Sequence, residues 1–323
     1  MSKYSLIDLP MYVRPEMYEV NISAITSSLM NHGKILSVYR IGSVTAPGIS
    51  DLDIFVVFKD GVKTNHDPLH KLDEIGKYLF VHKLFGASLE HFHQALRVTK
   101  FHNYRLVGGE ETRISNDLLP ANERLLKTQT ALEFLIKMYM VMNIQQKYKI
   151  IKVRAFLLEA RALEYDLEFL GVTQGPLFDS VKEIIELRKQ WFLTRNNTEK
   201  IEAIFNTLFT HLSTFLAEIL TREVFYTSHI LNGRFASNVR WTNANSLSIS
   251  KFGFPMPSFI AGMFKKNYFK VLNKVNSFSM KLPVNENPPE FLGDRFALFK
   301  TMNEYNKIHI PNFMPPGTSL KIM

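Results

Sequence analysis

Cysteine is absent from the 323-residue chain, and its absence removes several kinds of chemistry. No disulfide can form, no thiolate can hold a metal, and no cysteine nucleophile can act. Any metal ion must therefore be held by oxygen atoms or by imidazole nitrogens. Hydrophobic residues make up 46% of the chain and charged residues 21%, which is typical of a globular protein with a large core.

Long uninterrupted apolar runs are also missing. The N-terminal stretch MSKYSLIDLPMYVRPEMYEV has no continuous hydrophobic segment of the kind found in signal peptides. The most apolar helical run, ALEFLIKMYMVM, contains Lys137 and is too short to span a bilayer. We therefore expect a cytoplasmic protein without a transmembrane segment. The chain also has no P-loop, no Gly-x-Gly-x-x-Gly and no Gly-x-Ser-x-Gly motif.

Acidic residues are missing from one long segment, residues 224–285, although the whole chain carries a net charge of +9. Basic and aromatic residues alternate there, which is typical of RNA binding because the charges follow phosphates and the rings stack on bases. An anionic membrane surface is a second possible partner. The third alternative is a helix at 262–278 that buries its aromatic face and leaves its lysines in water. The basic residues are Arg234, Arg240, Lys251, Lys265, Lys266, Lys270, Lys274 and Lys281.

The N-terminal region, residues 1–119, has the pattern of a mixed α/β domain. β-branched and aromatic runs predict strands, and Asp67 and Pro68 are suited to the start of a helix. We therefore expect an α+β fold with a mixed sheet in this head. The predicted helices are 16–30 and 66–85, and the predicted strands are 35–43, 52–58, 95–101 and 104–110.

Residues 120–223 have apolar side chains at three- and four-residue spacing, which predicts an all-helical domain. The remaining region, 224–323, is basic and rich in aromatic residues, with short β-like pieces at 237–259 and a proline-rich tail after Pro283 that we expect to lie along the surface. The four predicted helices of the middle domain are 122–144, 148–170, 177–193 and 198–220.

Asp51 and Asp53 stand one residue apart at the start of an apolar strand, in the stretch YRIGSVTAPGISDLDIFVVFKD. Residues i and i+2 of a strand point to the same side, roughly 7 Å apart, so both carboxylates face one site. Like charges at this distance repel unless a cation lies between them. Mg²⁺ or Mn²⁺, held by carboxylates and by substrate phosphates, supplies that charge in phosphoryl transfer.

The turn before the two aspartates fits the same chemistry. Gly42 lets a ligand approach the backbone closely, and Ser43 offers a hydroxyl and an N–H to phosphate oxygens. Ser50, directly before Asp51, is a further candidate for contact with a bound nucleotide. Either element alone is common, but the combination of strand, Gly-Ser, Pro-Gly turn and Asp-x-Asp strand is specific.

This stretch resembles the nucleotidyltransferase superfamily that includes DNA polymerase beta, poly(A) polymerases, CCA-adding enzymes and aminoglycoside nucleotidyltransferases. The resemblance lies in Gly42 and Ser43, followed by Asp51-Leu52-Asp53, and the spacing in PGISDLD is similar to the poly(A) polymerase and archaeal CCA-adding branches. It implies an α/β catalytic head followed by a helical domain. It also implies Mg²⁺-dependent transfer of a nucleoside monophosphate from an NTP to an unidentified acceptor, with release of pyrophosphate.

The chain departs from the family pattern in its third carboxylate, because no Asp occurs between residues 74 and 116. Glu110 is the best placed by strand order, and some relatives instead use a Glu of the helical domain. A His-x-His pair at His91 and His93 is a weaker metal candidate. The missing Asp favours an alternative, a non-catalytic relative that binds nucleotide, RNA or a partner. The other acidic candidates are Glu74, Glu90, Glu111, Glu159, Glu164 and Asp166.

The basic segment generates a first prediction. Replacing Lys265, Lys266, Lys270 and Lys274 by Gln removes four positive charges, so RNA binding should weaken and its dependence on salt concentration should become less steep. Affinity measured over a salt series for both proteins is the test. An unchanged affinity with an unchanged salt slope would remove RNA from the possible partners, and loss of vesicle binding alone would indicate a membrane surface.

Overall fold

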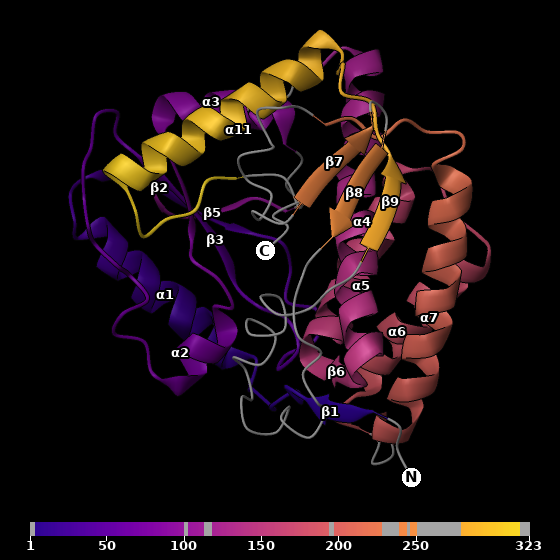
Figure 1. The fold of residues 1–323 in the computed structure, drawn as a ribbon. Coiled ribbons are helices and arrows are strands. Elements are labelled where there is room, and N and C mark those ends of the chain that lie inside the picture. The colour runs from indigo at the N-terminus through magenta and orange to yellow at the C-terminus, as the bar shows by residue number, and fades with distance from the viewer. Residues whose placement is uncertain are drawn as a thin grey trace. The chain divides into compact units, whose positions relative to one another are not determined.

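The computed structural model describes residues 4–99, 103–112, 118–193, 197–227, 239–243, 246–250 and 279–316 (Figure 1). Its contacts divide the chain into two compact units. The first, called the head unit below, joins Met11–Leu126 to Asp294–Gly317. The second, called the helical unit, contains the described residues of Met1–Pro10 and Lys127–Gly293. This grouping differs from the three consecutive regions expected from the sequence, because a C-terminal segment belongs to the N-terminal head.

The head unit is built on a four-stranded mixed sheet with the order β4-β3-β2-β5. β2 (Ile35–Ile41) pairs antiparallel with β3 (Asp53–Phe58) and with β5 (Arg105–Gly109). β3 pairs in parallel with β4 (Phe85–Ser88). The expected α+β class with a mixed sheet is therefore confirmed.

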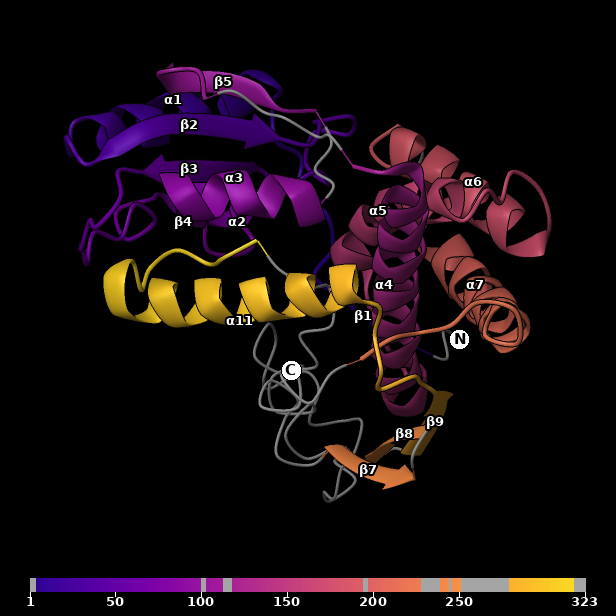
Figure 2. The ribbon, with the colours of Figure 1, turned by 90° about the horizontal axis from the view of Figure 1, so that it is seen from above.

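Helices cover both faces of this sheet (Figures 1 and 2). α1 (Glu16–Met30) and α2 (Glu74–Leu79) pack on one face, whereas α3 (Leu89–Val98) and α11 (Glu290–His309) pack on the other. Because successive side chains of a strand point to opposite faces, the apolar run of β3 supplies both cores. Its residues Ile54, Val56 and Phe58 belong to the α1 side, and Phe55 and Val57 belong to the α3 side.

Two predictions in the head are wrong. The helix expected at 66–85 is confined to α2, because the Asp67 carboxylate accepts the Leu69 N–H in a turn at 3.0 Å and Asp73 caps the helix instead. The strand expected at 95–101 falls largely on α3, which begins after the N-cap Ser88. α3 buries apolar side chains at helical spacing, so its periodicity outweighed the β-like composition of its last residues.

The proline-rich tail after Pro283, which the sequence predicted to lie along the surface, is partly buried in the head unit. It contains the 20-residue helix α11, whose Met302 is fully buried against the sheet. After this helix, Phe313 packs edge to face on Phe58 at 4.9 Å. The Met314 carbonyl accepts the Gly86 N–H at 2.9 Å and so extends the sheet beyond β4. The prolines stand only before and after the helix, where they do not interrupt it.

The helical unit contains the four predicted helices (Figure 2). They are α4 (Pro120–Tyr148), α5 (Val153–Phe169), α6 (Pro176–Gln190) and α7 (Asn197–Ile219), and the first turns of α4 belong to the head. The helix expected from residue 148 starts later, because β6 intervenes. A two-stranded parallel sheet also belongs to this unit. In it, β1 (Ser5–Ile7) pairs with β6 (Ile150–Lys152).

Within the described residues, two of the β-like pieces of the C-terminal region belong to a three-stranded antiparallel sheet. Its order is β7 (Val239–Asn243), β8 (Ser246–Ser250) and β9 (Ser279–Pro283). The helix predicted at 262–278, with the lysines proposed to bind RNA, lies outside the described residues.

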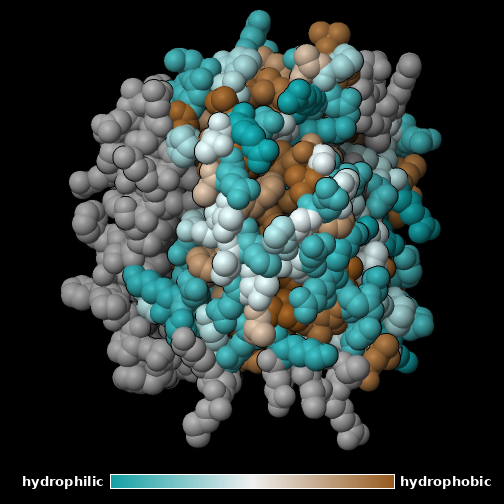
Figure 3. All heavy atoms as spheres, turned by 90° about the vertical axis from the view of Figure 1, so that its right-hand side faces the viewer, coloured by the Kyte–Doolittle hydropathy of each residue, from teal (hydrophilic) through white to brown (hydrophobic). Residues whose placement is uncertain are grey.

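Figure 3 shows the side of the molecule on which α7 lies in Figure 1. Small hydrophobic patches lie there among hydrophilic side chains. Among the described residues no helix is long and apolar enough to cross a membrane.

A buried carboxyl group lies inside the helical unit. Asp166 of α5 is 6% exposed and Glu133 of α4 is 1% exposed. Burial raises the pKa of Asp166 well above its ordinary range; the charge of Lys137 lowers it and the charge of Glu133 raises it further. Between the ordinary and the raised pKa the folded chain binds the proton and the unfolded chain does not. The stability that this group contributes is therefore lost as the pH rises through its folded-state pKa.

Asp166→Asn tests this assignment, because it keeps the shape of the side chain and removes the charge. The melting temperature of the variant should exceed that of the wild type at pH 8, and the difference should shrink at pH 5. Glu168→Gln, on an exposed position of the same helix, is the matched control. Parallel melting curves for wild type and Asp166→Asn over this pH range would contradict the assignment.

Candidate metal centre

The connection between β2 and β3 carries the candidate site. Ile41 and Asp53 are paired where the two strands meet this connection. Gly42 has a φ of +72°, a conformation that favours glycine. A Cβ at Gly42 would lie 3.8 Å from Oδ2 of Asp53, so the absent side chain leaves space directly beside that carboxylate.

Two tyrosines, one on α1 and one on α2, hold the backbone of this connection by hydrogen bonds. The Tyr18 hydroxyl of α1 donates to the carbonyl of Ser50 at 2.8 Å and accepts the N–H of Gly48 at 2.9 Å. The Tyr78 hydroxyl of α2 donates to the carbonyl of Gly48. The N–H of Leu52 donates to a carbonyl at the end of α2 at 3.0 Å. Since these contacts hold backbone atoms on either side of Asp51, the loop is rigid before any ligand binds.

Asp51, Asp53 and His82 come together at this point. One ligand atom from each residue lies within 4.8 Å of the other two, and all three side chains are partly buried. His82 Nε2 is 2.8 Å from Oδ1 of Asp53. Among the described residues this is the one group of three acidic or imidazole side chains close enough to share a metal ion.

His82 reaches the aspartates because of the parallel pairing of β3 with β4. Phe55 pairs with Phe85, so the residues before β4 lie beside those that begin β3. The His82 ring contacts the Phe85 ring at 5.2 Å. Its Nδ1 donates to the carbonyl of Lys83 at 2.7 Å, which directs Nε2 toward Asp53.

His82 is the one basic side chain of this cluster, and its pKa is shifted. Burial lowers its pKa, but the hydrogen bond and charge of Asp53, the Lys83 carbonyl and the charge of Asp51 together raise the pKa above its ordinary value. Both ring nitrogens face oxygen atoms that can accept a hydrogen bond. These contacts favour the imidazolium form, whose charge would offset the repulsion between the two carboxylates.

The other predicted site residues are placed as follows. Ser43 is an exposed residue next to Gly42. Ser50 is 1% exposed, and its hydroxyl accepts the Ala46 N–H at 3.2 Å, so it belongs to the internal bonding of the loop. The N–H of Glu110 donates to the carbonyl of Leu36 at 2.9 Å.

Leu36 and Ile41 lie near opposite ends of β2, about 16 Å apart at about 3.3 Å per residue. The fold therefore separates Glu110 from the aspartates. The carboxylates Glu159, Glu164 and Asp166 belong to the helical unit.

The two histidines of the His-x-His motif lie on α3. His91 Nδ1 is 3.0 Å from the hydroxyl of the N-cap Ser88.

Reasoning from the sequence missed His82. Its signal was a histidine three residues before a short strand, but β4 has the sequence FGAS, in which small residues hide the strand. Only the parallel pairing with β3 shows that residue 82 lies next to Asp53.

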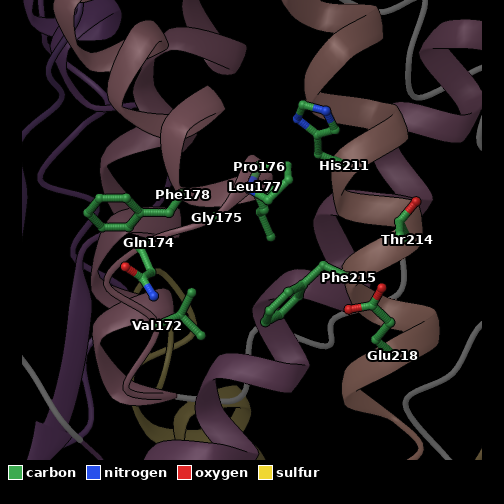
Figure 4. Close-up of a pocket in the computed structure, with 10 residues that line it drawn as sticks. All are labelled: Val172, Gln174, Gly175, Pro176, Leu177, Phe178, His211, Thr214, Phe215 and Glu218. Carbon is green, nitrogen blue, oxygen red and sulfur yellow. The ribbon is translucent and has the colours of Figure 1, made fainter.

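A separate cavity of about 270 Å³ lies in the helical unit between the start of α6 and α7 (Figure 4). The side chains of Leu177 and Phe215 point into it. Nδ1 of His211 lies 2.7 Å from the hydroxyl of Ser180. Glu218 is the one carboxylate among its lining residues. The cavity therefore lacks the paired carboxylates of the head and fits a small, mostly apolar group.

Comparisons with known protein families, with curated proteins and with solved structures find no match to this chain. The interpretation of the site therefore depends on its geometry. It also depends on the resemblance carried by the residues from Gly42 to Asp53.

Proposed function

We propose that this chain transfers a nucleoside monophosphate from an NTP to a hydroxyl acceptor, with release of pyrophosphate. One observation carries the proposal: the carboxylates of Asp51 and Asp53 converge on one point beside Gly42, where a side chain is missing. Carboxylate oxygens are the ligands that Mg²⁺ and Mn²⁺ prefer, so the donor set fits such an ion. When bound, the divalent ion neutralises phosphate charge and makes the attacking hydroxyl easier to deprotonate.

The residues of the loop have distinct parts in this reaction. Asp51 and Asp53 hold the ion, and the open space at Gly42 lets the triphosphate approach the backbone. The exposed hydroxyl of Ser43 donates to a phosphate oxygen. The acceptor hydroxyl gives its proton to solvent water, and its oxygen forms a bond to the α-phosphorus. The bond from that phosphorus to the bridging oxygen breaks, and pyrophosphate leaves with the electron pair.

The rigidity of the loop supports this proposal as well. The tyrosine hydroxyls of α1 and α2 hold the backbone at Gly48 and Ser50. A site held in place before binding loses little entropy when the substrate arrives, which favours the in-line geometry of the reaction.

Asp51→Asn and Asp53→Asn test the proposal. Each keeps the side-chain volume and removes one negative charge from the metal site, so pyrophosphate release should fall by about 100-fold or more, since even outer partners of metal ligands contribute about 10–100-fold. The fold should survive. Asp51→Asn removes the repulsion between the two carboxylates. Asp53→Asn weakens the partly exposed ion pair with His82, which contributes under about 1 kcal/mol to the free energy of unfolding.

Glu110→Gln is the matched control and should retain wild-type turnover, because the fold places this carboxylate at the far end of β2. Each labelled NTP is first incubated with a cell extract, which is then separated into RNA, protein, lipid and small-molecule fractions. The fraction that retains the label identifies the class of acceptor, and turnover of each variant is then measured with that acceptor. Wild-type turnover in both Asn variants would refute the proposal. Nucleotide binding without release of pyrophosphate in any fraction would instead indicate a non-catalytic nucleotide-binding protein.

A further inference from the structure

The third member of the cluster at Asp51 and Asp53 is a nitrogen ligand. His82 offers an imidazole where a third carboxylate was expected from the sequence, and its ligand atom lies within 4.8 Å of those of both aspartates. Two carboxylates and one imidazole form a mixed oxygen and nitrogen set. Such a set differs in its metal preference from a set made of oxygen atoms alone.

The orientation of His82 is that of a metal ligand. Histidines that bind metals commonly donate their second ring N–H to a backbone carbonyl or a carboxylate, which fixes the ring and its tautomer. The Nδ1 of His82 makes this bond to the carbonyl of Lys83 at 2.7 Å. Nε2 therefore faces the two aspartates, and a bound ion would replace its present hydrogen bond to Asp53.

The backbone that carries His82 is held firmly by the C-terminal segment of the head unit. The Lys83 ammonium donates to the carbonyl of Pro311 at 2.9 Å. The carbonyl of Met314 accepts the N–H of Gly86, and the N–H of Met314 donates to the carbonyl of Leu84, each at 2.9 Å. These bonds fix the chain directly after His82 on a strand edge, so the imidazole is set in position by the fold.

We infer that Asp51, Asp53 and His82 form a three-ligand site that prefers a first-row transition ion, with Mn²⁺ favoured over Mg²⁺. Mg²⁺ binds almost entirely through oxygen, whereas imidazole is a good ligand for first-row transition ions. The inference rests on the metal role proposed above for the two aspartates. It adds the third ligand and the class of ion that this site takes.

Pulsed electron paramagnetic resonance of the whole chain with Mn²⁺ and no nucleotide tests the inference directly. Nitrogen coupled to the bound Mn²⁺ should appear in the wild type and change when histidine is labelled with ¹⁵N. The coupling should vanish in His82→Ala and persist in His93→Asn, which alters an exposed histidine of the same unit. Mn²⁺ bound without nitrogen coupling in the wild type would overturn the inference, even if His82→Ala does not fold.

Equilibrium titrations with Mn²⁺ and Mg²⁺ provide the second measurement. Wild-type protein should bind Mn²⁺ at least about tenfold more tightly than Mg²⁺, and His82→Ala should lose about 10–100-fold of its Mn²⁺ affinity. His82→Glu replaces the imidazole by a carboxylate, so its preference should shift toward Mg²⁺ by about tenfold. Equal affinities of wild type and both variants for Mn²⁺ would overturn the inference.

The two proposals fail in different ways. Mn²⁺ bound with nitrogen coupling but no nucleotidyl transfer supports the metal site and refutes the proposed reaction. Transfer that runs with Mg²⁺, together with Mn²⁺ bound without nitrogen coupling, supports the reaction and refutes the role of His82.

Discussion

Repulsion between the carboxylates of Asp51 and Asp53 is the constraint on which the candidate site depends. The fold holds both groups close to one point, where like charges at short range oppose folding unless a positive charge lies between them. His82 lies 2.8 Å from Asp53, and its contacts with the aspartates and the Lys83 carbonyl raise its pKa despite burial. The loop beside this cluster is held by Tyr18 and Tyr78, which supports the proposed cation site.

Local patterns were enough to predict the centre of the fold. β2, β3 and α1 have strong periodicity and clear boundaries, so the sequence identified them. α11 and β4 were missed for different reasons. Prolines on both sides of α11 hid a helix whose buried face is visible only against the sheet, and β4 is too short and too rich in small residues to give a strand pattern. The C-terminal return to the head depends on long-range packing that no local pattern contains.

The residues of the candidate site also divide into those that local patterns predict and those that only long-range contacts bring together. The motif placed Asp51, Asp53 and Gly42 correctly beside one another, because a short connection between paired strands fixes their distances. Strand order alone suggested Glu110, but the direction of β5 carries it to the wrong end of β2. His82 was invisible to the sequence because its place depends on the register between β3 and β4. Contacts made across the sheet, rather than along the chain, decided which side chain completes the cluster.

We propose that a divalent ion and the triphosphate of an NTP meet at Asp51 and Asp53. A crystal structure with Mn²⁺ and a non-hydrolysable NTP analogue, with anomalous differences measured at the manganese edge, is the decisive measurement. We expect a manganese peak within bonding distance of both carboxylates and of a phosphate oxygen, with the triphosphate along Gly42 and Ser43. Manganese and nucleotide bound elsewhere, for example in the cavity between α6 and α7, would contradict it.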